Sequence, residues 1–140
     1  MNGIHGKLKH IFVKSDKPDL GSAAWVEKGG IVGRGNLLDY AAWAENQGIA
    51  IDHFSPHSIS ASTLQDIAES QRTELKDGDI LFILSGWVLA FSKLSDEEAV
   101  ALAEMTAPPA VGLETSEETL RWIWESGFSA VAGDQPSFEA

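Results

Sequence analysis

A run of five apolar residues, Ile80 to Leu84, constrains the fold more than any other stretch of the sequence. It lies between an Asp-Gly-Asp turn that ends at Asp79 and the pair Ser85-Gly86, so it is too short for an independent helix. Unbroken hydrophobicity is typical of a strand that is covered on both faces. Ligands gather at the carboxyl ends of such strands, which makes Ser85, Gly86 and Trp87 candidate site residues. A turn at Gly86 and a core position for Trp87 would explain them at least as well.

The remaining elements alternate between helix and strand signals. We expect further strands near residues 31–38 and 129–133, and a less clear one at Leu8–Val13. We expect helices from about Ala23 to Lys28, from Tyr40 to Gln47 after an Asp39 cap, and after capping boxes at Ser62–Gln65, Ser95–Glu98 and Thr115–Glu118. The chain of 140 residues is therefore predicted to form one α/β domain, with a mixed or parallel sheet and flanking helices.

Composition narrows the classes of function. The sequence has no cysteine, which excludes disulfides, thiolate zinc sites and a cysteine nucleophile. A net charge of −11 opposes binding to nucleic acid or to an anionic membrane. No apolar run is long enough to cross a membrane, and the N-terminus has no signal-peptide core. We therefore expect a cytoplasmic protein without nucleic-acid or membrane partners.

The histidines and the Gly-Arg-Gly segment could belong to binding sites, but ordinary structural roles explain both. His5 and His10 have no familiar ligand spacing, and Pro56 interrupts any helix that could bring His53 and His57 to one metal, so all four are expected to be ordinary histidines. The Gly-Arg-Gly centre of segment 31–39 suggests a bulged strand or two short strands and lacks the pattern of a phosphate loop. Arg34 within it either binds an anion or is structural.

Three segments together resemble one family. They are Trp25–Tyr40 with its Gly-Gly-Ile-Val-Gly-Arg-Gly core, Asp77–Trp87 with its Gly-Asp-Ile-Leu run, and Glu114–Glu139 with its Arg-Trp-Ile-Trp and Ala-Val-Ala-Gly-Asp motifs. In this order they are similar to the fungal branch of the metal-dependent cyclase family, which includes kynurenine formamidase-like hydrolases. The resemblance covers residues 23–139, while residues 1–22 match poorly. It implies a reduced version of that family's swivelling β/β/α fold.

The resemblance also implies a metal that this sequence does not obviously hold. Family members bind zinc or manganese through a His-x-Gly-Thr-His-x-Asp motif and later ligands, and neither block is present here, as if the chain were shortened at both ends. We therefore expect no metal cofactor. The family's Arg-Thr-Gly on the central strand is replaced by Leu84-Ser85-Gly86.

The residues left to line the family's cleft are five. We predict Asp134 and Ser85 as catalytic residues and Arg34, Trp87 and Ser137 as substrate-binding residues. Asp134 could instead cap a turn, and Ser137 could be a surface hydroxyl.

Three functions remain open. The first is a shortened enzyme that cyclises or hydrolyses a small cyclic or aryl-acyl metabolite, in a fungal secondary-metabolite pathway, by positioning its substrate. The second is a non-catalytic relative that binds a ligand or a partner, as a homo-oligomer or with a paralogue. The third is a fragment of a longer metal-dependent hydrolase.

Overall fold

The computed structural model describes residues 26 and 28–139, and contacts divide the chain into residues 1–32 and 33–140. In the first unit, a short glycine turn is described, in which the Gly29 amide donates to the Val26 carbonyl. The strand expected at Leu8–Val13 and most of the helix expected at Ala23–Lys28 lie outside the described residues.

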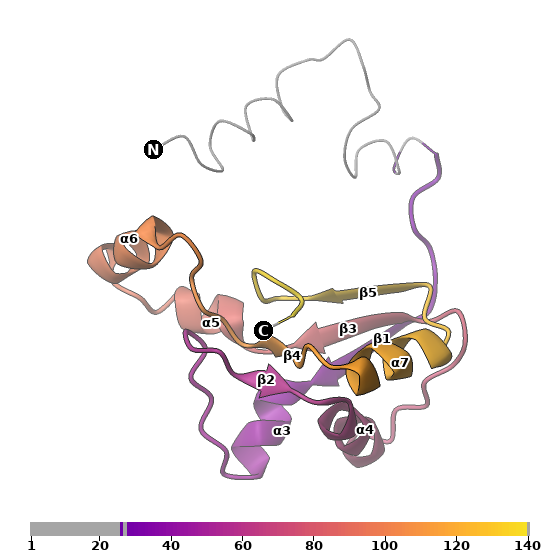
Figure 1. Cartoon of the computed structure of the whole chain (residues 1–140). Helices are drawn as coiled ribbons and strands as arrows, with labels where there is room; N and C mark the ends of the chain where they lie inside the picture. The colour runs from indigo at the N-terminus through magenta and orange to yellow at the C-terminus, as the bar shows by residue number, and fades with distance from the viewer. Residues whose placement is uncertain (1–25, 27, 140) are drawn as a thin grey trace. The chain divides into compact units, whose positions relative to one another are not determined.

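The second unit is built on three parallel strands (Figure 1). They are β1 (Gly35–Asp39), β3 (Ile80–Leu84) and β5 (Ala130–Gly133), in the order β1-β3-β5. A second sheet pairs the two-residue strands β2 (Ser58–Ile59) and β4 (Gly112–Leu113), also in parallel. Every described strand pair is therefore parallel, which confirms an α/β fold and decides between the mixed and parallel sheets that the sequence allowed.

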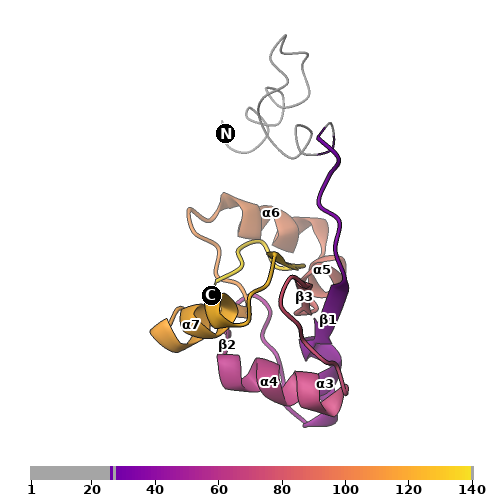
Figure 2. The same cartoon turned by 90° about the vertical axis from the view of Figure 1, so that its right-hand side faces the viewer.

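Five helices connect and cover these strands. They are α3 (Tyr40–Asn46), α4 (Ala61–Ser70), α5 (Trp87–Phe91), α6 (Asp96–Glu104) and α7 (Glu117–Glu125). Figures 1 and 2 show α3, α4 and α7 on the same side of the three-stranded sheet. None of the helices in the described part of the chain is long and apolar enough to cross a membrane.

One face of the three-stranded sheet forms the core. Leu38, Leu81 and Ile83 point to this face and are almost completely buried. They pack with Leu64 and Ile67 of α4, which share the apolar side of that helix. Burial of such aliphatic side chains is the main favourable contribution to folding.

The other face of the sheet is only partly covered by the residues that the structure describes, whereas the sequence predicted cover on both faces. Leu37 and Phe82 are direct neighbours in the register of β1 and β3, and they are 49% and 41% exposed. The ring of Phe82 lies against Gly35, where a Cβ atom would come within 3.1 Å of it. An apolar run shows that a strand can be buried, but it does not show whether the same chain covers it.

Two of the expected helix caps are confirmed. The Asp39 side chain accepts a hydrogen bond from the Ala42 amide and caps α3. Ser95 and Glu98 form the reciprocal capping box at the start of α6.

Two other caps were predicted at the wrong residue. Ser60, and not Ser62, caps α4, since its hydroxyl accepts from the Thr63 amide at 3.2 Å. Ser116, and not Thr115, caps α7. Both segments contain adjacent hydroxyl residues, so the capping pattern alone could be satisfied at more than one position.

Four elements differ from expectation, one in its start and three because they are too short to predict. The first strand starts at Gly35 rather than near residue 31, and its register with β3 is unbroken, so there is no bulge within it. The helix α5 and the strands β2 and β4 were not predicted. Segments of two to five residues are too short to show a hydrophobic period.

Candidate functional site at the carboxyl ends of β3 and β5

Ser85 and Asp134 join the carboxyl ends of two neighbouring strands. Asp134 Oδ1 accepts hydrogen bonds from the amide and the hydroxyl of Ser85, both at 2.7 Å. Asp134 Oδ2 accepts a longer bond of 3.3 Å from the Val88 amide in α5. Each of the two residues directly follows its strand, and parallel strands end at the same edge of a sheet, which explains why they meet. Ser85 is fully buried, so its hydroxyl serves Asp134 and not the solvent.

The backbone of Trp87 contacts this pair, but its side chain packs elsewhere. Its amide donates to Ser85 Oγ at 3.3 Å. Its indole stacks on Phe91 with ring centroids 4.9 Å apart and meets the edge of Phe54 at 6.1 Å. The indole Nε1 is buried without a partner among the described residues. The side chain therefore belongs to an aromatic cluster that supports α5.

The loop after Asp134 leads into a cavity of about 640 Å³. Four of the chain's five prolines line it, and prolines give it rigid walls that carry no amide donors. The lining also includes Ser137, which was predicted to bind substrate, and Glu139. The full set is Pro56, Ala107, Pro108, Pro109, Ala110, Thr115, Pro136, Ser137 and Glu139.

Gln135 is a polar residue of this loop that the sequence did not single out. It is only 9% exposed, and both polar atoms of its amide are buried without a partner among the described residues. Gly133 permits this arrangement, because a Cβ atom there would collide with the Gln135 amide. Buried side-chain amides without a hydrogen-bond partner are rare, so the Gln135 amide is a candidate to form hydrogen bonds with a ligand or with water.

Arg34 lies at the opposite edge of the sheet, where β1 and β3 begin. It makes a two-pronged ion pair with Asp79, with Nε–Oδ1 and Nη2–Oδ2 distances of 2.7 and 2.5 Å. Asp79 is 3% exposed and also accepts from Asn36 and from the Lys76 amide. The hydrogen bonds from Arg34 hold the pKa of Asp79 below its ordinary value, against the opposing effect of desolvation. The structure thus brings together Ser85, Asp134 and the Trp87 backbone, but not Arg34.

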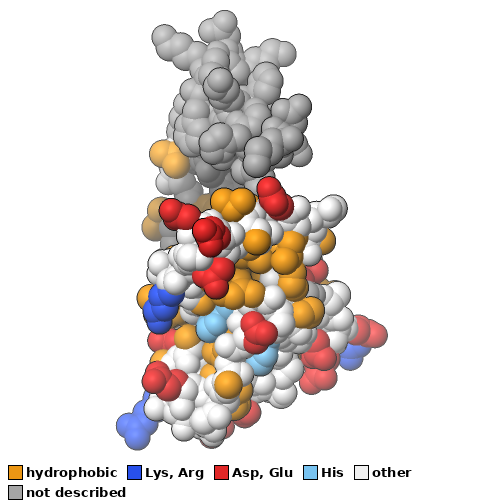
Figure 3. Space-filling model, turned by 90° about the vertical axis from the view of Figure 1, so that its left-hand side faces the viewer, with side chains coloured by type: hydrophobic (Ala, Val, Ile, Leu, Met, Phe, Trp, Pro, Cys, Tyr) orange, Lys and Arg blue, Asp and Glu red, His pale blue; other side chains and the backbone are white. Residues whose placement is uncertain are grey.

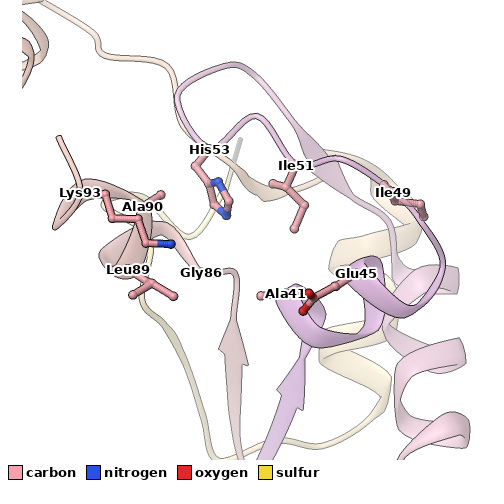
Figure 4. Close-up of a pocket in the computed structure, with 9 residues that line it drawn as sticks. All are labelled: Ala41, Glu45, Ile49, Ile51, His53, Gly86, Leu89, Ala90 and Lys93. Atoms are coloured by element: carbon pink, nitrogen blue, oxygen red, sulfur yellow. The ribbon is translucent and has the colours of Figure 1, made fainter.

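The two described histidines, His53 and His57, do not form a metal-binding arrangement. His57 Nε2 lies 2.5 Å from the hydroxyl of Tyr40, whose pKa is raised by burial. His53 lines a smaller pocket between α3 and α5 (Figure 4). Within residues 26 and 28–139, no three His, Cys, Asp or Glu side chains gather in a group that could hold a metal ion. The described residues therefore do not fit the zinc or manganese that the resemblance implies. His5 and His10 lie outside the described residues.

Comparison with known proteins agrees with this fold. The chain is similar to a crystal structure described as a novel cyclase, with a TM-score of 0.61 and 26% identity. The match covers 77% of this chain and 33% of that chain, so this chain spans about a third of the solved relative. Comparison with curated proteins gives no match. Residues 10–140 match the model of the Cyclase family, described as "Putative cyclase". The chain therefore belongs to the cyclase family.

Proposed function

We propose that this chain provides a small-molecule site of a cyclase-family enzyme at the carboxyl ends of β3 and β5. The observation that carries the proposal is the Ser85–Asp134 pair, which fixes the start of the loop that lines the proline-walled cavity. The cavity volume is in the range of small-molecule sites. The substrate class is a small cyclic or aryl-acyl metabolite, in keeping with family membership. A place in fungal secondary metabolism and a cytoplasmic location stay predictions.

The contacts suggest roles for these residues that differ from the predicted ones. Asp134 uses its oxygens on Ser85 and Val88, so in this proposal the pair positions the loop. Ser137 offers a hydroxyl to the substrate, and Glu139 is the ionisable residue in the cavity lining. We assign to Glu139 the role of proton acceptor. Arg34 and the Trp87 indole take no direct part.

The chemistry proposed here is ring closure by positioning. Binding can hold the amine of a substrate against the carboxyl carbon of the same molecule. The two groups are then ordered before they react, so the reaction step itself does not lose that freedom of motion or reorganise solvent. The amine nitrogen forms the new bond to the carboxyl carbon and its proton passes to Glu139. Glu139 returns this proton to the departing hydroxyl, which leaves the carboxyl carbon as water. No step is assigned to a metal, because the described residues do not fit one.

The test uses 2-aminophenylglyoxylate, an aryl keto acid that closes to a cyclic amide with loss of water. We expect the purified chain to accelerate closure without added metal. Glu139→Gln is expected to reduce the acceleration by about a hundredfold or more, in the range of general-base effects. Ser92→Ala is the control, because the Ser92 hydroxyl bonds to the Leu89 carbonyl within the α5 segment.

A second candidate is a non-catalytic relative that binds a small molecule or a partner chain. It is favoured by the mutually satisfied Ser85–Asp134 pair and by the open sheet face at Leu37 and Phe82. A homo-oligomer or a complex with a paralogue would cover that face. Saturable binding of the keto acid without acceleration would select the small-molecule form of this function. Neither binding nor acceleration would contradict the enzyme and leave a partner chain as the ligand, which size-exclusion chromatography of the purified chain then tests.

A further inference from the structure

A second pocket lies between α3, α5 and the connection that follows α3 (Figure 4). Its volume is about 270 Å³, and it shares no lining residue with the proline-walled cavity. The lining consists of Ala41, Glu45, Ile49, Ile51, His53, Gly86, Leu89, Ala90 and Lys93. Figure 3 shows histidine side chains exposed beside a hydrophobic patch on one face of the molecule.

The walls of this pocket are aliphatic. Ile49 and Ile51 come from the connection after α3, and Leu89 faces the same space from α5 (Figure 4). Ile49 is 41% and Leu89 is 61% exposed, so both present apolar surface that a ligand could cover. Covering that surface with a branched aliphatic side chain would be favourable in proportion to the apolar area removed from water.

Two opposite charges flank the apolar walls. Glu45 enters from α3 and Lys93 from the far side of α5, and their charged ends both turn toward the space between them (Figure 4). Neither side chain has an ion pair or a hydrogen bond within residues 26 and 28–139, although many of the charged groups elsewhere in this region have one. The pocket therefore presents one uncommitted anion and one uncommitted cation.

His53 adds a third polar group. Its Nε2 lies against Gly86, where a Cβ atom would come within 3.0 Å of that nitrogen. The imidazole has no hydrogen bond within the part of the chain that the structure describes, and Figure 4 shows it pointing into the pocket beside Lys93. An imidazole and an ammonium on the same side can both donate to one carboxylate.

We propose that this pocket binds a free branched-chain α-amino acid such as L-leucine. The ligand carboxylate lies at Lys93 and His53, its ammonium at Glu45, and its side chain against Ile49 and Leu89. A zwitterion suits the pocket better than a simple anion, which Glu45 and the net charge of −11 would repel. It also suits it better than a simple cation, which Lys93 would repel. This inference goes beyond the proposed function and uses none of its residues.

The first experiment compares three ligands with the same branched side chain by isothermal titration of the purified chain. L-Leucine has both charges, 4-methylpentanoate lacks the amine, and 3-methylbutylamine lacks the carboxylate. We expect saturable binding of leucine and affinities about tenfold or more weaker for the other two, since each loses one charge-assisted hydrogen bond. No binding of leucine, or equal binding of leucine and 4-methylpentanoate, would overturn the proposal.

The second experiment removes each charge from the protein. Lys93→Met and Glu45→Gln are each expected to weaken leucine binding about tenfold. Lys76→Met is the matched control, because Lys76 pairs with Glu74 away from the pocket, and it should leave the affinity unchanged. Both charged residues are exposed, and circular dichroism shows whether each variant keeps its fold. Unchanged leucine affinity in both pocket variants would contradict the assignment.

Discussion

Asp134 accepts hydrogen bonds from both the amide and the hydroxyl of Ser85, residues 49 positions apart in the sequence. The contact fastens the end of β5 to the end of β3, and the bond from the Val88 amide extends it to α5. One carboxylate thus fixes three segments: the turn after β3, the first turn of α5 and the loop toward the proline-walled cavity.

Removing this carboxylate should destabilise the chain. Asp134→Ala leaves the buried Ser85 amide and hydroxyl without an acceptor, and we expect the free energy of unfolding to fall by about 2–3 kcal/mol. Asp134→Asn keeps one acceptor oxygen and should cost about 1 kcal/mol. Urea unfolding measures both, with Asp66→Ala on the exposed side of α4 as the control. Equal stability of Asp134→Ala and the control would contradict this role.

The cap of α4 can be tested with two neighbouring serines. Ser60→Ala removes the hydroxyl that accepts from the Thr63 amide and should cost about 1 kcal/mol of stability. Ser62→Ala, within the first turn of α4, should have an effect of only a few tenths of a kcal/mol. Thermal and urea unfolding of the two variants side by side decides the position of the cap. A larger loss for Ser62→Ala would restore the cap predicted from sequence.

Tyr40 should titrate at higher pH than a free tyrosine, because burial raises its pKa. The folded state then keeps the phenol proton where the unfolded state loses it. The resulting stability is fully present below the ordinary tyrosine pKa of about 10 and is lost as the pH rises through the folded-state pKa. Tyr40 is the chain's single tyrosine, so ultraviolet absorbance of folded and urea-denatured protein reports it alone. Coincident titration curves would contradict the prediction.

Alanine variants of Gly86 and Gly48 distinguish the cost of backbone strain from the cost of side-chain crowding. Both have positive φ, +85° and +70°, so alanine at either position is strained by about 1–2 kcal/mol. At Gly48 an added Cβ atom meets nothing within 4 Å, but at Gly86 it meets His53 Nε2 at 3.0 Å and Ala41 Cβ at 3.1 Å. Gly86→Ala should therefore cost more stability than Gly48→Ala, as measured by urea unfolding. Equal losses would show that His53 does not pack on Gly86.

The sequence predicted the long elements of the fold well and their surroundings poorly. The run Ile80–Leu84 is the central strand, and Asp39 caps α3 as expected. The composition of the central strand could not show that Phe82 is partly exposed, because cover on that face depends on other chain segments and not on the strand itself. Likewise the apolar residues before Gly35 resemble a strand, but pairing with β3 decides where the strand begins.

For the site, topology was more informative than residue type. Ser85 and Asp134 were both predicted to line the family's cleft, and each directly follows a strand of one parallel sheet, where they are hydrogen-bonded. Arg34 was grouped with them because the resemblance left it to line the same cleft, yet it precedes β1 and pairs with Asp79 at the other edge. The proline-walled cavity had no sequence signal, since Pro56 and Pro136 converge only in the folded chain.

The parallel pairing of β1 with β3 also limits when the chain can fold during synthesis. Arg34 and Asp79, which mark the start of the two strands, are 45 positions apart, and β3 joins β5 over a similar distance. The described strands form no hairpin that could nucleate this sheet, so a long loop must close before β1, β3 and β5 pair with one another. On the ribosome, β1 would emerge before β3 and could not pair with it until β3 had been synthesised. The open apolar side of β1 would then be exposed to chaperones or to other nascent chains throughout that interval.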